Sequence, residues 1–247
     1  MANLMRTSNP ALNERAFQGQ AAFGETMTLQ GTVNKTGVLL LCVVVGAAWT
    51  WGMSHSETPE AAIPWMIGGI LGGFVVALVT VFKKEWSPVT SLIYSLLEGL
   101  ALGGISAMFE QRYPGIAIQA VGLTFGTLFA MLLAYKTGVI RATEKFRIGV
   151  FAATGGIMLL YLVDIVLHFF SRPVPFIHEG TPIGIAFSLF VVVIAALNLV
   201  LDFDLIETGV NHGAPKYMEW YGAFGLMVTL IWLYLEILRL LGKARRR

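Results

Sequence analysis

Charged residues are scarce in this sequence. Asp, Glu, Lys and Arg make up 13% of its 247 residues, whereas hydrophobic residues make up 56%. A soluble globular domain carries about 25% charged residues. The few charges also lie in short clusters between long apolar runs, and the mean hydropathy is +0.71. These shortages argue against a large soluble core and predict a membrane protein.

Cysteine is nearly absent. Cys42 is the only one, and it lies within an apolar run. A single cysteine excludes an internal disulfide framework and a cysteine-based metal site. The net charge of +2 is too small to indicate a nucleic-acid partner. The sequence also lacks a P-loop, a strand-linked G-x-G-x-x-G, an H-E-x-x-H and a nucleophile elbow, so we expect neither an enzyme nor a bound cofactor.

The first 34 residues are polar and contain no basic segment followed directly by an apolar one. They therefore do not read as a cleavable signal peptide. We interpret residues 1–34 as a partly disordered cytosolic tail and residues 35–247 as one membrane domain.

Seven apolar segments approach the length of about 20 residues that a helix needs to cross a bilayer. Their connections are short, which favours antiparallel neighbours in a single helical bundle. The segments are 36–53, 61–82, 87–109, 115–135, 148–170, 182–201 and 218–241. Small residues four apart let helices approach closely in lipid, and glycines have this spacing at Gly68/Gly72, Gly69/Gly73, Gly99/Gly103 and Gly122/Gly126.

The basic residues of the loops set the expected orientation. Lys83 and Lys84 lie in one loop and four basic residues lie within 136–147, whereas the alternate loops carry one or none. Cytosolic loops are enriched in Lys and Arg, so we expect a cytosolic N-terminus. Seven crossings then place the basic C-terminal stretch LRLLGKARRR outside, against that rule. We favour seven crossings over an incomplete last one, because the earlier loops already set the orientation.

Ionisable residues inside such segments cost at least a few kcal/mol at the bilayer centre and are default functional candidates. Glu98 lies near the middle of the third segment. Its carboxyl either bonds a neighbouring helix in protonated form or titrates in a central cavity, and we leave both readings open.

Two other pairs of ionisable residues lie close to segment ends. Asp164 and His168 are four apart and share a helix face, which suits an interfacial ion pair better than a proton relay or half a metal site. Glu236 and Arg239 are three apart, and we interpret them as a local salt bridge.

The stretch AALNLVLDFDLIETG, residues 195–209, places Asp202, Asp204 and Glu207 at the end of the sixth segment. Residues two apart lie about 200° apart around a helix, so Asp202 and Asp204 cannot both face the bundle interior. Asn198 shares the face of Asp202, which lies deeper than the other two acids. We expect Asp202 to point inward. The alternative is that all three acids end the helix in cytosolic water.

Three stretches occur in order at matching helix positions: EGLALGGIS, LDFDLIETG and GAPKYMEWYGAFGLMVTLIWLYLEILRLL. Together they resemble the bacterial branch of the Bax inhibitor-1/YccA family, also called TMBIM, over about residues 37–241. The resemblance implies an all-α integral membrane protein, a seven-transmembrane-helix bundle with the last helix central. It also implies a pH-sensitive calcium leak in the bacterial inner membrane.

In that family an aspartate at the cytosolic end of helix six pairs with a second aspartate in helix seven. Asp202 occupies the first position, but the second falls on Thr229. Glu98 and Glu219 are therefore the candidate partners of Asp202. Two carboxylates in a low-dielectric cavity cannot both ionise at low cost. When both ionise at higher pH they offer hard oxygen ligands suited to Ca²⁺, and acidification weakens calcium binding.

Three functional hypotheses follow from the sequence. The first is a calcium leak gated by protonation of Asp202, with Ca²⁺ and protons as its ions and Asp202 as a possible calcium ligand. The second is a regulator that transports nothing and binds another membrane protein, such as a membrane-anchored protease that seizes the polar tail. The third, an intramembrane hydrolase, is supported only by Asp164 and His168.

Overall fold

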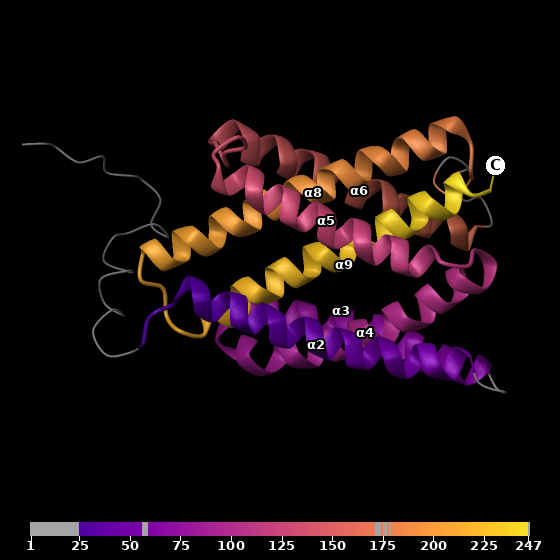
Figure 1. Ribbon diagram of the computed structural model, residues 1–247, viewed down its shortest axis with the longest axis horizontal. Helices are drawn as coiled ribbons and strands as arrows, with labels where there is room; N and C mark the ends of the chain where they lie inside the picture. Colours follow the sequence, from indigo (N-terminus) through magenta and orange to yellow (C-terminus); the bar gives the residue numbers. More distant parts are fainter. Residues whose placement is uncertain (1–24, 56–58, 171–173, 175–176, 178, 247) are drawn as a thin grey trace, which may run out of the picture.

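Seven long α-helices form an all-helical bundle in the computed structural model, which describes residues 25–55, 59–170, 174, 177 and 179–246 (Figure 1). Each is long and apolar enough to cross a membrane, as the sequence predicts. The helices are α2 (Leu29–Ser54), α3 (Ala62–Phe82), α4 (Ser87–Arg112), α5 (Ile116–Lys136), α6 (Glu144–Phe169), α8 (Pro182–Asn211) and α9 (Met218–Ala244). Two 3₁₀ turns, η2 (Pro59–Ala61) and η3 (Lys84–Trp86), precede α3 and α4.

Polar residues cap the starts of two helices. Thr28 precedes α2, and its hydroxyl accepts a hydrogen bond from the Gly31 amide at 3.0 Å. Thr181 caps α8 in the same way, 3.2 Å from the Gly184 amide. These caps satisfy amides that a helix start leaves unpaired. Helix α2 therefore begins within the polar stretch 1–34, of which residues 1–24 lie outside the described part of the chain.

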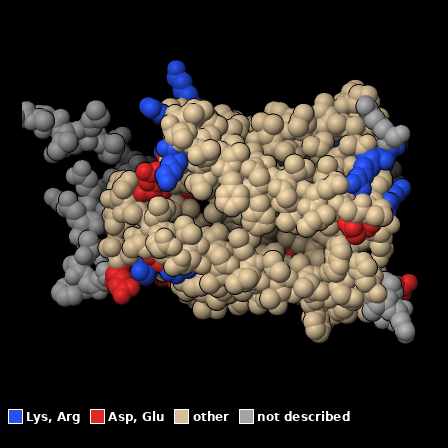
Figure 2. All heavy atoms as spheres, in the orientation of Figure 1, with Lys and Arg blue, Asp and Glu red and all other residues tan. Residues whose placement is uncertain are grey.

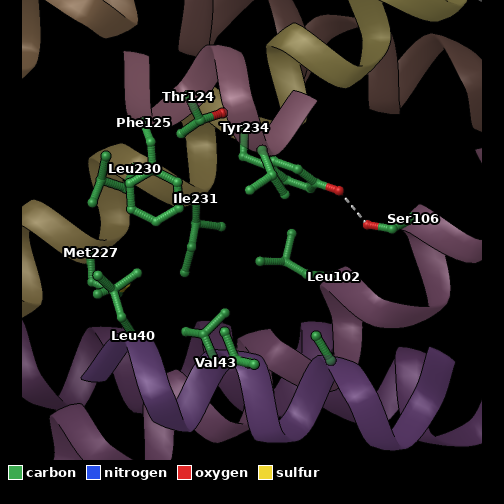
Figure 3. Close-up of a pocket in the computed structure, with 13 residues that line it drawn as sticks. Leu40, Val43, Leu102, Ser106, Thr124, Phe125, Met227, Leu230, Ile231 and Tyr234 are labelled. Carbon is green, nitrogen blue, oxygen red and sulfur yellow. Dashed lines mark hydrogen bonds between the residues drawn. The ribbon is translucent and has the colours of Figure 1, made fainter. Parts of the chain in front are cut away.

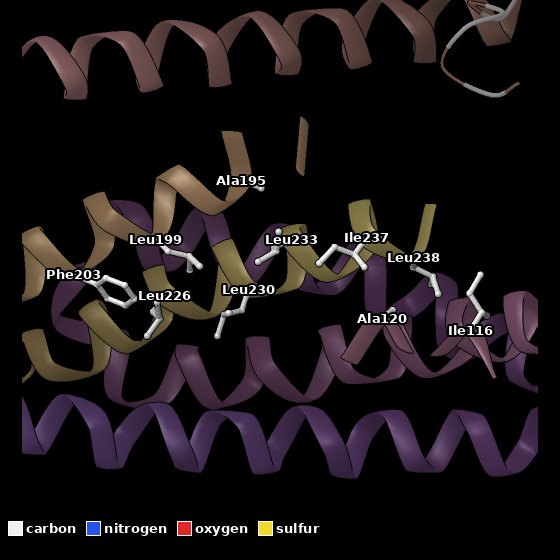
Figure 4. Close-up of a cluster of buried hydrophobic side chains, with 10 residues drawn as sticks. All are labelled: Ile116, Ala120, Ala195, Leu199, Phe203, Leu226, Leu230, Leu233, Ile237 and Leu238. Atoms are coloured by element: carbon white, nitrogen blue, oxygen red, sulfur yellow. The ribbon is translucent and has the colours of Figure 1, made fainter. Parts of the chain in front are cut away.

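Helix α9 is the centre of the bundle, as the resemblance implies. It packs against α2, α4, α5 and α8, whereas α3 packs mainly on α4, and α6 on α8. In the most apolar 18-residue stretch of α9, 56% of the residues are buried. The corresponding share is 17% in α3 and in α6. Figure 4 shows how the core forms around it, from Leu226, Leu230, Leu233, Ile237 and Leu238 of α9, Ala195, Leu199 and Phe203 of α8, and Ile116 and Ala120 of α5.

Helix α4 approaches α2 and α3 across glycines. A Cβ on Gly99 would lie 2.4 Å from the Val43 carbonyl oxygen, and one on Gly69 would lie 2.4 Å from the Leu97 carbonyl oxygen. The close packing expected from glycine spacing is therefore present at Gly99 and Gly69. It is absent at Gly122 and Gly126, where an added Cβ would meet nothing within 4 Å.

The bundle has two charged ends and an apolar middle. Lys, Arg, Asp and Glu gather at both ends in Figure 2, and other residues cover nearly all of the band between them. Successive helices alternate in direction, so the start of α2 and the end of α9 lie at opposite ends (Figure 1). We call the end where α2 begins the N side and the end where α9 finishes the C side.

Candidate functional site

Asp202 lies in α8 and faces the central helix α9. Its Oδ1 would lie 4.0 Å from a Cβ added to Gly225, and its carboxyl interacts with the Thr229 side chain. Its Oδ2 is buried and has no hydrogen-bond partner among the described residues. A buried polar atom without a partner is costly, and among the described carboxyl groups only Asp202 and Glu236 have such an oxygen.

The α9 side of this site is small and neutral. Gly225 and Thr229 are four apart and therefore share a helix face, and the Thr229 hydroxyl donates to the Gly225 carbonyl oxygen at 3.3 Å. Thr229 is buried and stands where the resemblance places a second aspartate. Within the described residues, no Lys, Arg or His forms an ion pair with Asp202.

Asn198 is engaged elsewhere although it lies one helical turn before Asp202. Its amide nitrogen donates to the Thr154 hydroxyl of α6 and to the Ile194 carbonyl oxygen, each at 2.9 Å. Asn198 therefore fastens α8 to the outer helix α6. No described contact joins its amide to the Asp202 carboxyl.

Glu98 lies at the interface between α4 and α3. Its Oε1 would be 2.7 Å from a Cβ added to Gly73, so the carboxyl occupies the space that this glycine leaves. Glu98 is half-buried, and no described contact joins it to Asp202. The Glu98 carboxyl therefore lies at the junction of α3 and α4.

Glu219 begins α9 and is fully buried among partners. It accepts hydrogen bonds from the Thr28 amide and the Thr28 hydroxyl, each at 2.8 Å. It also forms ion pairs with Lys35 of α2 and with Lys216, the latter at 3.4 Å. The structure therefore places Glu219 in a junction that ties the start of α2 to the start of α9, and no described contact joins it to Asp202.

Residues 25–28 form a strap across the N side that no feature of the sequence predicts. The Met27 amide donates to the Ala214 carbonyl oxygen at 2.7 Å, and the Lys216 amide donates to the Glu25 carbonyl oxygen at 3.0 Å. The Met27 side chain is buried. The strap joins residues about 190 positions apart, so no local pattern signals it.

Asp204 and Glu207 point away from Asp202, in agreement with the helical spacing. Asp204 forms an ion pair with Arg147 of α6, and Glu207 accepts a hydrogen bond from the Tyr135 hydroxyl of α5. Both acids therefore lie at the N side, where α8 meets the ends of α5 and α6.

The C side holds a second group of ionisable residues on α9. Glu236 is 2% exposed, and its Oε1 accepts hydrogen bonds at 2.9 Å from both Arg239 and the Tyr161 hydroxyl of α6. Lys243 is 3% exposed and donates to the Gly184 carbonyl oxygen at 3.1 Å and the Ser188 hydroxyl at 2.8 Å. The expected Glu236–Arg239 pair is present, but it belongs to a buried network rather than to a helix surface.

Asp164, at the end of α6, lies near the C side and is bonded to the following loop. Its Oδ1 accepts a hydrogen bond from the Val174 amide at 2.9 Å, which fastens the segment after α6 to that helix. This bond gives the Asp164 carboxyl a structural partner at the end of α6.

No group of three or more His, Cys, Asp or Glu side chains in the described residues is arranged to hold a metal ion. Calcium takes six to eight oxygen ligands in proteins. One Asp202 carboxyl and one Thr229 hydroxyl fall short of that number.

Comparison with known protein families matches residues 9–246 to the family described as Bax inhibitor 1 like. The match begins well before residue 37, where the resemblance described from the sequence begins. No curated protein and no solved structure matches the chain.

Proposed function

Because this chain belongs to the Bax inhibitor 1 like family, we propose that it forms a calcium leak pathway of the bacterial inner membrane that responds to pH through Asp202. The observation that carries the proposal is the Asp202 carboxyl, which has a buried oxygen without a partner and faces the central helix. In this proposal protonation of Asp202 alters the contact between α8 and α9.

The physical basis is the difference between the two forms of the carboxyl. A carboxylic acid can donate one hydrogen bond, whereas a carboxylate only accepts and carries a charge. Neither Lys nor Arg pairs with Asp202 among the described residues, so its charge is not balanced by a neighbour. A change of protonation therefore shifts the free energy of the α8–α9 contact and biases the bundle between two states.

Calcium enters this proposal as the transported ion. The Asp202 carboxylate supplies one hard oxygen ligand and a negative charge on the path of the cation. Conduction requires binding that is weak enough for the ion to leave. A single carboxylate beside a neutral hydroxyl fits that requirement.

Calcium flux into liposomes tests the proposal. We expect the native protein to show flux that depends on pH, and Asp202→Asn to remove most of that dependence because the amide cannot titrate. Asp204→Asn is the matched control, since Asp204 lies two residues away but pairs with Arg147. Absence of native flux, or an Asp202→Asn profile equal to the native one, would refute the proposal.

A second candidate function rests on the strap. Residues 25–28 are fixed at the N side, so the preceding polar segment must start from that end of the bundle. We propose, as the alternative, a regulator that transports nothing and presents this segment to a membrane-anchored protease.

Removal of residues 1–24 tests the alternative and leaves the bonds of Thr28 to Glu219 intact. We expect the truncated protein to lose co-purification with the protease and to retain its thermal stability. A longer deletion through residue 30 would also remove the Thr28 contacts and so confound loss of binding with loss of stability. Unchanged co-purification after the shorter deletion would count against this function.

A further inference from the structure

A cleft of about 1200 Å³ lies at the N side, between α2, α5 and α8. Its walls include Leu40 of α2, Leu128 of α5 and Phe203 of α8, and Leu226 of the central helix contributes to its base. The face in Figure 2 is hollowed between the helices that Figure 1 labels α2 and α5. Small-molecule sites usually measure about 300–1,000 Å³, so this cleft is large for a bundle of this size.

A second cavity, of about 180 Å³, continues the cleft deeper into the bundle. The two share Leu40 and Phe125 as lining residues. Figure 3 shows its apolar walls from α2, α4, α5 and α9, with the hydrogen bond between Ser106 and Tyr234, 2.6 Å, beside it. Together the cavities form an apolar groove that starts at the N side and runs along α9.

The mouth of the groove carries two basic side chains. Lys136 ends α5, Arg141 lies in the following loop, and both line the cleft. Neither forms an ion pair with a described residue, and the described bond of the Arg141 guanidinium is from Nε to the Gly138 carbonyl oxygen at 3.3 Å. The acids at the same mouth, Asp204 and Glu207, are already bonded to Arg147 and Tyr135.

We propose that this groove binds one anionic phospholipid from the leaflet at the N side. Lys136 and Arg141 hold the phosphate, and one acyl chain lies in the groove against the central helix. Lipid tails are as apolar as the groove, so burial of the chain gives little preference over bulk lipid. The basic residues supply the selectivity, since cationic residues at the membrane surface attract anionic lipids.

The dimensions favour a lipid chain over a protein helix. An α-helix with its side chains is about 10–12 Å across. The inner cavity of about 180 Å³ is too small for such a helix but admits a single hydrocarbon chain. The cationic mouth likewise matches a phosphate rather than an apolar peptide.

Gly37 gives a direct way to fill the groove. It lines the cleft, and a Cβ added to it would meet nothing within 4 Å. Gly37→Leu therefore places a side chain in the groove without a clash at its base. Gly52→Leu is the matched control, because Gly52 is on the same helix, also has open space at its Cβ and does not line the cleft.

Lipid titration of the full-length protein in detergent, followed by native mass spectrometry, tests the proposal. We expect phosphatidylglycerol to bind more tightly than phosphatidylcholine. The double variant Lys136→Gln/Arg141→Gln should weaken phosphatidylglycerol binding roughly 10- to 30-fold. The control Lys83→Gln/Lys84→Gln removes two charges outside the cleft and should leave that binding within about twofold of the native value.

Several results would overturn the proposal. It fails if the two double variants bind phosphatidylglycerol equally, or if Gly37→Leu binds it as well as Gly52→Leu does. Competition by inorganic phosphate that displaces the lipid completely would indicate a simple anion site instead. Lipid binding by Asp202→Asn should equal that of the native protein, so this test is independent of any calcium flux.

Discussion

At the residue scale, three acids of this bundle differ in what surrounds them. Glu219 has two cations and a threonine, and Glu236 has an arginine and a tyrosine on Oε1. Oδ2 of Asp202 and Oε2 of Glu236 are both buried without a described partner. Glu236 nevertheless has a cation, whereas Asp202 has only the neutral Thr229 beside it and no described cation. An acid whose charge has no described cation calls for a functional explanation.

A second carboxyl beside Asp202 should make folding strongly dependent on pH. Thr229→Asp places two carboxyl groups together, and they repel when both are ionised. The folded variant then holds more protons than the unfolded chain, so its stability should fall as the pH rises, by up to about 1.4 kcal/mol per pH unit. Thermal unfolding in detergent across pH measures this slope.

Thr229→Asn is the matched control for that variant, because it introduces a polar side chain of similar size that does not titrate. Its stability should follow the pH dependence of the native protein. Equal slopes for Thr229→Asp and Thr229→Asn would show that residue 229 does not face Asp202 in the folded protein.

At the element scale, α4 and α9 are held by different means. Helix α9 contributes large apolar side chains to the core, whereas α4 meets α2 and α3 at glycines, where backbones approach closely. In lipid this close approach replaces the hydrophobic effect as the source of helix association. The outer helices α3 and α6 then need only one packed face, in agreement with their low burial.

The glycine contacts should be sensitive to a single methyl group. Gly99→Ala adds a Cβ 2.4 Å from the Val43 carbonyl oxygen, a backbone atom that cannot move alone. We expect a loss of about 1–3 kcal/mol of stability, the usual cost of overpacking. Denaturant unfolding in detergent measures the loss.

Gly122→Ala provides the comparison, because its added Cβ would meet nothing within 4 Å. Higher helix propensity should make this variant neutral or more stable by up to about 1 kcal/mol. If Gly99→Ala were as stable as Gly122→Ala, α2 and α4 would not be in glycine contact in the membrane.

At the scale of the whole molecule, the seven helices place the two chain ends on opposite sides of the bundle. The basic C-terminal residues, which conflict with the charge rule for loops, are used within the fold. Lys243 is bonded to α8, and Arg245 donates to the Pro114 carbonyl oxygen at 2.8 Å and to Gln119 at 2.9 Å. These locally bonded charges cap the C side of the bundle.

Cysteine labelling tests this topology. In a Cys42→Ser background, Val139→Cys introduces a thiol at the N side and Ala244→Cys introduces one at the C side. We expect a membrane-impermeant maleimide to label Ala244→Cys in intact spheroplasts and Val139→Cys only after permeabilisation. Labelling of both variants in intact spheroplasts, or of neither before permeabilisation, would mean that α9 does not cross the membrane.

The number and approximate position of the helices could be predicted from the sequence alone. A bilayer requires about 20 apolar residues in each crossing, and the seven apolar runs of this chain correspond to the seven observed helices. Hydropathy placed the start of α8 at residue 182, where the helix begins, but it missed the first turns of α2, whose cap Thr28 lies in the polar stretch. Helical spacing likewise predicted that Asp202 and Asp204 point to different sides of the helix, because a helix fixes the angle between neighbouring side chains.

Only the tertiary structure decided which of those residues meet. Asp202 and Thr229 lie on different helices, and Glu219 is bonded to Lys35 and Thr28 from the far end of the chain. The groove likewise arises from the separation of α2 and α5 around α9. The local sequence determines which segments enter the membrane and which residues share one face of a helix. Contacts between residues so distant in the sequence depend on how the helices pack. That packing depends on all seven helices together.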